Sequence, residues 1–214
     1  MHRVAKLAEC GIFGGMNMGL ELSSATVLLE PAGALLALLC VWLAARGSLW
    51  NWPVAILSTL IYALLFYQIR LYSDAALQIV FLISQVYGWW NWKYTSRNSS
   101  TMVPEHLKSF YTVLLCVLSV FVGAGWYLAL RKIKPDAAYP AWDTALAVSS
   151  LLATWLQARK YIQNWYVWIV TDLLYVPLYL LLGYQVTAIL YFIFALLACY
   201  GLYHWRTLSL PKTK

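Results

Sequence analysis

The sequence carries little charge. Asp, Glu, Lys and Arg make up 11% of its 214 residues, and 63% of the residues are hydrophobic. A water-soluble domain has roughly 25% charged residues, most of them on its wetted surface. This shortage of charge excludes an ordinary soluble domain and indicates an integral membrane protein.

The sequence also lacks the residue patterns of enzymes and metal sites. Its cysteines stand far apart, without a CxxC pair or Cys/His ligand spacing, and its histidines are scattered. No G-x-S-x-G motif, P-loop or glycine-rich phosphate loop is present. The sequence therefore predicts no enzyme, no cofactor, no metal site and no disulfide framework. The cysteines are Cys10, Cys40, Cys116 and Cys199, and the histidines are His2, His106 and His204.

The formal net charge of +7 does not indicate a nucleic-acid partner. Lys and Arg stand singly or in pairs between apolar runs and never form a dense patch, which is typical of loops beside a lipid bilayer. If the apolar segments cross the bilayer in turn, nine Lys and Arg lie on the side of the C-terminus and six on the other side. This split favours a cytoplasmic C-terminus, because positive loops stay on the cytoplasmic side.

Seven apolar segments are long enough to cross a bilayer, which takes about 20 residues of helix, with roughly 17 to 25 tolerated. Lipid offers no hydrogen bonds to the backbone, and a helix satisfies its own N–H and C=O groups. The sequence therefore predicts an all-α integral membrane protein with seven transmembrane helices. The predicted spans are Thr26–Ala45, Pro53–Ile69, Ala75–Trp92, Phe110–Leu130, Trp142–Ala158, Trp165–Leu182 and Val186–Trp205.

Tryptophans crowd the ends of these spans. An indole ring at headgroup level keeps its apolar body in lipid and its N–H group in water. These rings are therefore predicted to anchor the helices at the membrane surface. They are Trp50, Trp52, Trp89, Trp90, Trp92, Trp142, Trp165 and Trp205.

A block of the sequence that holds three spans occurs twice. A shift of 113 positions aligns Asn51–Trp92 with Asn164–Trp205 without a gap. The same shift pairs the first span with the fifth, so that spans one to three recur as spans five to seven. The identical pairs include Asn51/Asn164, Trp52/Trp165, Tyr62/Tyr175, Ala75/Ala188, Phe81/Phe194, Tyr87/Tyr200, Gly88/Gly201 and Trp92/Trp205.

The repeat predicts the organisation of the chain. Corresponding spans are four apart, so both blocks cross the membrane in the same direction and the fourth span links them. This is a parallel 3+1+3 repeat, an architecture of carriers that hold their substrate at the repeat interface. The predicted parts are an N-terminal arm (1–25), a first three-helix repeat (26–92), a loop and linker helix (93–138), a second three-helix repeat (139–205) and a C-terminal tail (206–214).

The sixth span carries the strongest candidate for a substrate site. One face of the predicted helix carries Trp165, Trp168, Asp172, Tyr175 and Tyr179, at positions i, i+3, i+7, i+10 and i+14. A carboxylate inside a membrane span is costly unless it is paired or faces water. Asp172 therefore indicates either a functional group or a structural partner for a neighbouring hydroxyl or amide. As a functional group, it would suit a flat organic cation held against the aromatic rings.

Spans two and three supply further candidates. Thr59 and Tyr62 occupy the equivalent face of the second span, with Thr59 in the place of Asp172. Gln78 and Gln85 share a face of the third span, where amides can bind a ribose or the edge of a heterocycle. Each glutamine can equally join neighbouring helices, and the sequence leaves both roles open.

These segments resemble the Pnu family of bacterial vitamin transporters. The resemblance lies in residues 29–44 (LEPAGALLALLCVWLA), 66–92 (FYQIRLYSDAALQIVFLISQVYGWWNW), 135–143 (PDAAYPAWD) and 158–172 (ARKYIQNWYVWIVTD). It implies a SWEET-like seven-helix fold, a multi-pass location in the bacterial cytoplasmic (inner) membrane and uptake by facilitated diffusion. A cytoplasmic vitamin kinase then makes uptake one-way.

The family resemblance also suggests the substrate. In the sixth span the nicotinamide riboside carriers of the family look like W-x-x-W-x-x-x-N, whereas this chain has Trp165, Trp168 and then Asp172. The resemblance thus implies a uniporter for a cationic vitamin, with nicotinamide riboside first and thiamine as the alternative, since both are flat cations. A membrane sensor or subunit that binds the vitamin without moving it is the alternative from another class. The sequence leaves a homo-oligomer open.

Overall fold

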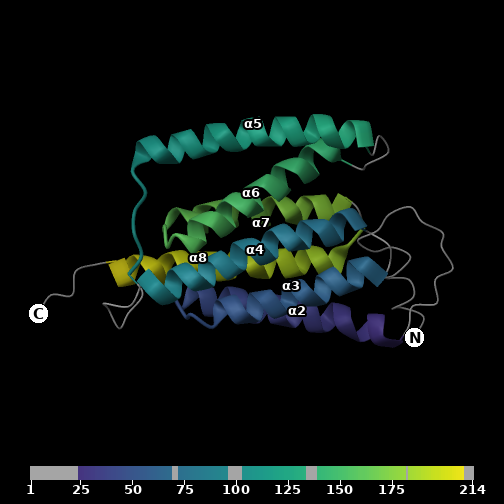
Figure 1. The fold of residues 1–214 in the computed structure, drawn as a ribbon, viewed down its shortest axis with the longest axis horizontal. Coiled ribbons are helices and arrows are strands. Elements are labelled where there is room, and N and C mark those ends of the chain that lie inside the picture. The colour runs from purple at the N-terminus through teal and green to yellow at the C-terminus, as the bar shows by residue number, and fades with distance from the viewer. Residues whose placement is uncertain (1–23, 69–71, 96–102, 134–138, 182, 210–214) are drawn as a thin grey trace, which may run out of the picture.

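The structure of the protein is a computed structural model that describes residues 24–68, 72–95, 103–133, 139–181 and 183–209. Within these ranges the chain forms seven α-helices (Figure 1), which confirms the all-α fold class. The helices are α2 Ser24–Ala45, α3 Asn51–Gln68, α4 Tyr72–Thr95, α5 Ser109–Ile133, α6 Pro140–Ala158, α7 Gln163–Leu181 and α8 Gln185–Ser209. The predicted ends at Ile69 and Leu182 and nearly all of the N-terminal arm lie outside the described residues.

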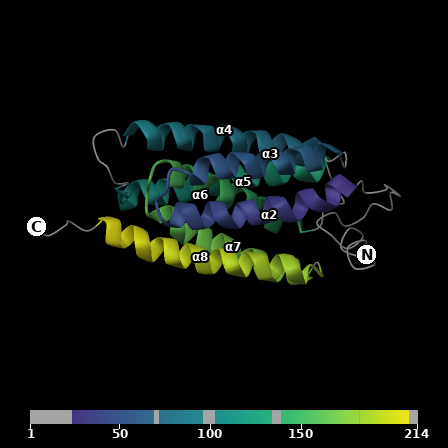
Figure 2. The same ribbon diagram turned by 90° about the horizontal axis from the view of Figure 1, so that it is seen from below.

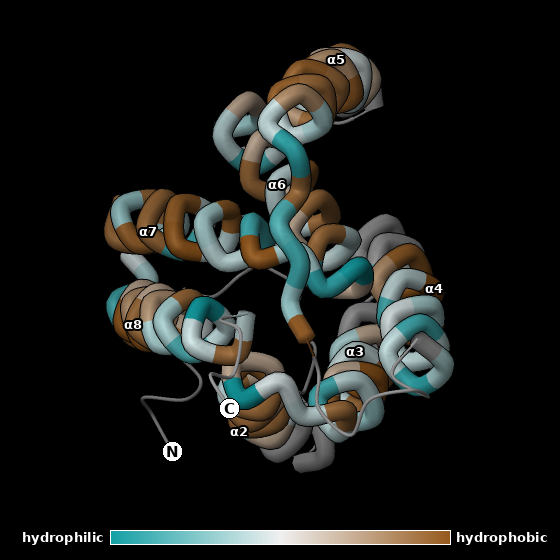
Figure 3. Tube along the Cα trace, turned by 90° about the vertical axis from the view of Figure 1, so that its left-hand side faces the viewer, coloured by the Kyte–Doolittle hydropathy of each residue, from teal (hydrophilic) through white to brown (hydrophobic). Residues whose placement is uncertain are grey.

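The helices lie side by side along one long axis (Figure 1 and Figure 2). Consecutive helices run in opposite directions, so α2, α4, α6 and α8 finish at the same end of the bundle, called here the α8 end. Contacts join α2 to α3, α3 to α4, α4 to α6, α6 to α7, α7 to α8 and α8 to α2. They close a ring of six helices, with α5 outside the ring against α6 (Figure 3). Helices α3 and α7 therefore stand on opposite sides of the ring.

The connections from α2 to α3 and from α6 to α7 have the same backbone conformation. Gly47 (φ +66°) and Lys160 (φ +62°) both lie in the left-handed region. Their N–H groups donate to the carbonyls of Ala44 and Gln157, in each case at 2.9 Å. Both turns are Schellman endings of the preceding helix. Since Lys160 lies 113 positions after Gly47, the repeated sequence makes a repeated turn.

Four tryptophans form the core at the α8 end. Trp52, Trp92, Trp165 and Trp205 are each 2% exposed or less, and they are called here the tryptophan cluster. The ring centroids of Trp52 and Trp92 are 5.4 Å apart, those of Trp92 and Trp205 5.8 Å, and those of Trp205 and Trp165 5.3 Å. Aromatic pairs attract one another at such distances, so the cluster stabilises this end of the bundle.

The prediction that these four rings anchor the helices at headgroup level is wrong. Spacing along the chain places them at helix ends, but α3, α4, α7 and α8 turn the rings inward, where protein covers them. Trp50 lies in the connection from α2 to α3 and is 70% exposed. For this ring, anchoring at headgroup level stays a prediction.

Two hydrogen bonds tie the repeated halves together at the tryptophan cluster. The indole N–H of Trp92 donates to the carbonyl of Gln157, and that of Trp205 donates to the carbonyl of Ala44, each at 3.0 Å. Ala44 and Gln157 are the next-to-last residues of α2 and α6. Each half thus holds the first helix of the other half by the last turn of its own third helix.

The outer surface of the bundle is largely apolar, as the brown colour of α5 shows in Figure 3. Among the described residues, two helical segments are long and apolar enough by length and composition to cross a membrane, Ser109–Ala129 and Gln185–Ser209. Two shorter apolar segments, Pro31–Ala45 and Asn51–Leu64, lie in α2 and α3.

Candidate functional site

Asp172 lies in the middle of α7 and is only 4% exposed. Among the residues that the structure describes, none donates a hydrogen bond to its carboxylate or forms an ion pair with it. A carboxylate in such a position has lost its hydration without gaining donors, which is costly. The position therefore favours the approach of a positive charge.

Trp168 lies one turn before Asp172. Its ring is half-buried and packs against the tryptophan cluster. The indole N–H donates to Oε1 of Gln157 at 3.2 Å, and Nε2 of Gln157 donates to Oδ1 of Asn51 at 3.4 Å. These two bonds fix the ring of Trp168 from the ends of α6 and α3.

Trp165 shares the stripe with Trp168 and Asp172, but the structure places it in the core. It is 1% exposed, and its ring fills the space beside Gly201 and Trp205. Its indole N–H is buried without an acceptor among the described residues, as is that of Trp52, its counterpart in the first half. The ring of Trp165 therefore supports Trp168 from behind.

Tyr175 lies one turn after Asp172, in a group of stacked tyrosines. Its ring centroid is 4.3 Å from that of Tyr191 and 5.7 Å from that of Tyr179, and the centroids of Tyr179 and Tyr191 are 5.1 Å apart. These three residues are called here the tyrosine cluster. Asp172 is near enough to act electrostatically on Tyr175 and Tyr191. The carboxylate thus lies between Trp168 on one side and the tyrosine cluster on the other.

Thr59 and Gln85 form a hydrogen-bonded pair that joins α3 to α4. The Thr59 hydroxyl donates to Oε1 of Gln85 at 3.1 Å, and Nε2 of Gln85 lies 2.8 Å from the same hydroxyl oxygen. Thr59 is buried and Gln85 half-buried. The amide of Gln85 thus joins α3 to α4, which is one of the two roles that the sequence indicates for it.

Tyr62 and Gln78 are both half-buried. Tyr62 packs its ring against α2 at Gly33, where a Cβ atom would come 3.0 Å from Cε2 of the ring. Gln78 lies two turns before Gln85 on α4.

The predicted site residues thus divide into two groups. Trp168, Asp172 and Tyr175 follow one another along α7, and Thr59 contacts Gln85 between α3 and α4. Because α3 and α7 stand on opposite sides of the ring (Figure 3), the two groups belong to opposite sides of the ring. Among the described residues, no three His, Cys, Asp or Glu side chains come together that could hold a metal ion.

This fold and sequence have counterparts among known proteins. Residues 27–207 match the family described as Nicotinamide mononucleotide transporter, a stretch that covers nearly all of the seven helices. The chain belongs to this family. It is accordingly a membrane protein of a transporter family and not an enzyme.

Individual relatives in this transporter family match most of the chain. The nicotinamide riboside transporter PnuC of Escherichia coli (strain K12) is 27% identical over 202 residues, which are 83% of this chain and 84% of the relative. The riboflavin/roseoflavin transporter RibM of Streptomyces davaonensis is 30% identical over 178 residues, 82% of this chain and 83% of the relative. The crystal structure of the vitamin B3 transporter PnuC has a TM-score of 0.70 at 21% identity and covers 87% of this chain and 83% of that one. This likeness shows the same fold.

Two residues that contact the predicted site residues, Gln157 and Tyr191, were not predicted from the sequence. Tyr191 lies 113 positions after Gln78, so the repeat could have pointed to it. Gln157 gave no such signal, since its counterpart is Ala44. The only signal for Gln157 in the sequence is that it is an amide in the last turn of an apolar helix.

Proposed function

We propose that the protein is a transporter that takes up a flat cationic vitamin across the bacterial cytoplasmic (inner) membrane by facilitated diffusion. Nicotinamide riboside is the first choice of substrate, and thiamine is the alternative. One observation carries the proposal: the Asp172 carboxylate is buried, and Trp168 and Tyr175 lie one turn to either side of it. An organic cation would stabilise the carboxylate while its flat faces contact aromatic rings.

The seven helices cross the membrane as a parallel 3+1+3 repeat, SWEET-like in arrangement, with α5 as the linker. Matched contacts support this organisation. Besides the equal turns at Gly47 and Lys160, the side chains of Asn51 and Asn164 each donate to the carbonyl three residues earlier, at 2.6 Å in both cases. In such repeats the substrate lies near the midplane between the halves.

The substrate site has one wall from each half. The α7 wall supplies the charge and the rings, and Trp165 supports it from the core. The wall from α3 and α4 supplies hydroxyl and amide groups that can bind a ribose or the edge of a heterocycle. The residues of the α7 wall are Trp168, Asp172 and Tyr175, and those of the other wall are Thr59, Tyr62, Gln78 and Gln85.

Asp172 supports a cationic substrate over riboflavin, which the name of one relative suggests. Nicotinamide riboside and thiamine each carry a positive charge on a ring, whereas riboflavin is neutral. A cation would pair with the buried carboxylate, whereas a neutral ligand would leave it without a partner. Hence a cation is favoured, although RibM is the more similar of the two relatives by identity.

Facilitated diffusion alone only equalises concentrations. Accumulation needs a cytoplasmic kinase that phosphorylates the vitamin, because the product then carries a negative charge and no longer fits a site built around Asp172. The α8 end, where six of the eight Lys and Arg residues in the described part of the chain lie, faces this kinase in the cytoplasm.

Liposomes that contain the purified protein test the proposal. Labelled nicotinamide riboside, thiamine and riboflavin are supplied outside, with or without the matching kinase and ATP inside. We expect the cations to equilibrate without a kinase and to accumulate as phosphates with it, while riboflavin enters slowly. Calorimetric binding without any entry would indicate a sensor or subunit instead of a carrier. Faster entry of riboflavin than of either cation would overturn the assignment of the substrate class.

A further inference from the structure

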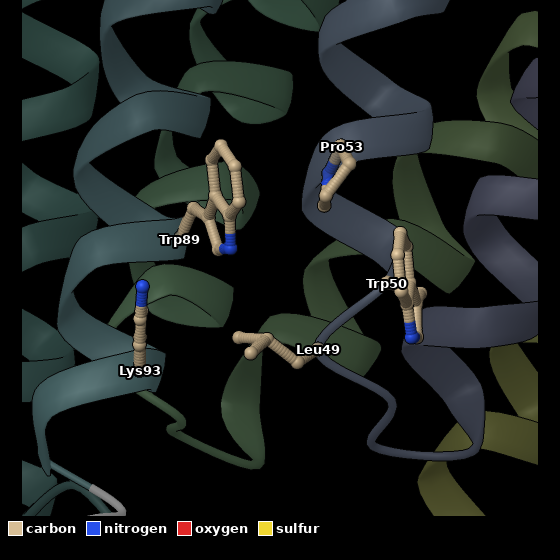
Figure 4. Close-up of a pocket in the computed structure, with 5 residues that line it drawn as sticks. All are labelled: Leu49, Trp50, Pro53, Trp89 and Lys93. Atoms are coloured by element: carbon tan, nitrogen blue, oxygen red, sulfur yellow. The ribbon is translucent and has the colours of Figure 1, made fainter.

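A hollow lies between the start of α3 and the end of α4, apart from the residues of the proposed substrate site (Figure 4). Its volume is about 210 Å³. Trp89 and Lys93 of α4 form one side, facing Leu49, Trp50 and Pro53 on the other. Lys93 is exposed and stands in the last turn of α4, so the hollow opens at the α8 end, on the outside of the ring.

The hollow lies at the α8 end of an exposed apolar track, which runs along α3 and α4. Trp50, Pro53, Leu57, Leu60 and Leu64 recur at helical spacing on one face of α3, and all three leucines are exposed. On α4 the face that ends in Lys93 carries exposed aliphatic side chains at the same spacing. They are Ile79, Ile83 and Val86. A charged group above two neighbouring apolar stripes matches a molecule with a polar head and long hydrocarbon chains.

The same place in the second half is filled by the chain itself. The counterpart of Lys93 is Arg206, which donates a hydrogen bond to the hydroxyl of Tyr166 and lies over its ring at 5.6 Å. The counterpart of Trp50 is Gln163, which is hydrogen-bonded to the backbone of Leu107 at 2.9 and 3.2 Å.

The segment before α5, which includes Glu105 and Leu107, therefore covers the equivalent place in the second half. The exposed fractions of two matching residues confirm this. Ile162, whose N–H donates to the carbonyl of Glu105 at 3.0 Å, is 0% exposed. Its counterpart Leu49 is 37% exposed. Within the described part of the chain, no segment covers the first half in the same way, and the ammonium of Lys93 has only the ring of Tyr94, 5.9 Å away.

We propose that this hollow binds the phosphodiester headgroup of an anionic phospholipid. The Lys93 ammonium supplies the positive charge, the indoles of Trp50 and Trp89 supply N–H donors at headgroup level, and the acyl chains lie along the track on α3 and α4. A second copy of the chain fits less well, because six of the eight Lys and Arg residues that the structure describes lie at the α8 end and would repel one another across an interface.

Native mass spectrometry of the purified protein in detergent tests the site. The probes are phosphatidylglycerol and phosphatidylcholine with identical acyl chains, and the variants are Lys93→Gln and Lys108→Gln. Lys108 is an exposed lysine at the same end of the bundle that does not line the hollow, so it is a matched control. We expect the wild type and Lys108→Gln to retain phosphatidylglycerol preferentially, and Lys93→Gln to lose this preference by roughly fivefold.

Three results would overturn the proposal. Equal losses in both variants would mean that the surface charge of the α8 end, and not the hollow, attracts the lipid. No preference for phosphatidylglycerol in the wild type would exclude a lipid site. Dimers that break up in Lys93→Gln, with no change in lipid retention, would assign the hollow to a second copy.

Discussion

The indole N–H of Trp168 donates a hydrogen bond to Oε1 of Gln157, 3.2 Å away, and so joins α7 to the last turn of α6. The first half of the chain has no equivalent bond, because Ala55 and Ala44 occupy the matching positions. The amide nitrogen of Gln157 lies against Asn51, which turns the amide oxygen toward Trp168. The duplicated scaffold is thus specialised in its second half, next to Asp172.

Substitution of Gln157 should weaken substrate affinity more than it weakens the fold. In Gln157→Leu the ring of Trp168 loses a bond worth about 1 kcal/mol, and we expect the KM of cation uptake in liposomes to rise roughly fivefold. Gln157→Glu keeps an acceptor oxygen for the Trp168 indole N–H but loses the amide donor to Asn51, so it should restore the KM in part. As a control, Gln163→Leu loses its bonds to Leu107 and should lower the unfolding temperature without raising the KM. Equal rises in KM for the Leu and Glu variants would contradict the positioning role.

Removal of the charge of Asp172 should discriminate between the two candidate cations. The nicotinamide riboside carriers of the family look like W-x-x-W-x-x-x-N and manage with an amide at this position. Asp172→Asn is therefore expected to weaken thiamine binding roughly tenfold, as for loss of a charged partner, and nicotinamide riboside binding less. Calorimetry on both ligands measures this difference.

Glu105→Gln provides the matched control for Asp172. Glu105 is an exposed carboxylate in the segment before α5 and belongs to neither group of site residues, so its substitution should leave both affinities nearly unchanged. Equal losses of both ligands in Asp172→Asn would mean that the carboxylate serves the fold and not the choice of substrate.

The helices and the stripe on α7 could be predicted from sequence because they depend on local properties. Apolar length predicts a membrane-spanning helix, and helical spacing puts Trp168, Asp172 and Tyr175 on one face. The position of Trp165 could not be predicted in this way. It shares the same face, but the absence of a side chain at Gly201 lets α8 approach its ring and take it into the core.

Contacts between residues of different helices could not be predicted from the sequence either. Thr59 and Gln85 could each be recognised as polar residues in apolar helices. Their spacing in the sequence does not indicate that they form a hydrogen bond between α3 and α4. Gln157 lies at the end of α6, and only the fold brings it to Trp168. Periodicity reports which face of a helix a residue occupies, whereas the helix that covers this face is decided by tertiary packing.

Thr59→Val separates the two roles of the pair with Gln85. Valine has nearly the shape of threonine but cannot hydrogen-bond, so the substitution leaves the amide of Gln85 free to turn. If Gln85 contacts the substrate, the KM of uptake should rise a few-fold, together with a loss of about 1 kcal/mol of stability. If the pair only joins α3 to α4, the stability alone should fall.

Ser58→Ala is the matched control for Thr59→Val. The Ser58 hydroxyl is buried on the same helix and donates to the carbonyl of Gly33 at 3.1 Å. Its loss should reduce the unfolding temperature to a similar degree while the KM stays at the wild-type value. A rise in KM for Ser58→Ala as large as for Thr59→Val would show that any loosening of α3 impairs binding.

Gly201→Ala should destabilise the protein, although alanine is normally the better helix former. A Cβ atom at position 201 would lie 2.7 Å from Cε2 and Cη2 of Trp165, and Trp205 packs edge-on against that ring at 5.3 Å, so the ring cannot retreat. Overpacking of this kind costs typically 1–3 kcal/mol, and Gly88→Ala should behave alike against Trp52.

Gly125→Ala is the control for both of these substitutions, because an added Cβ on α5 meets nothing within 4 Å. There the better helix propensity acts alone and should raise stability by up to about 1 kcal/mol. Unfolding temperatures in detergent measure all three variants. If Gly201→Ala were as stable as Gly125→Ala, the ring of Trp165 would have room to move, and it could no longer serve as the fixed support behind Trp168. The affinity of the site would then depend on the bond from Gln157 alone.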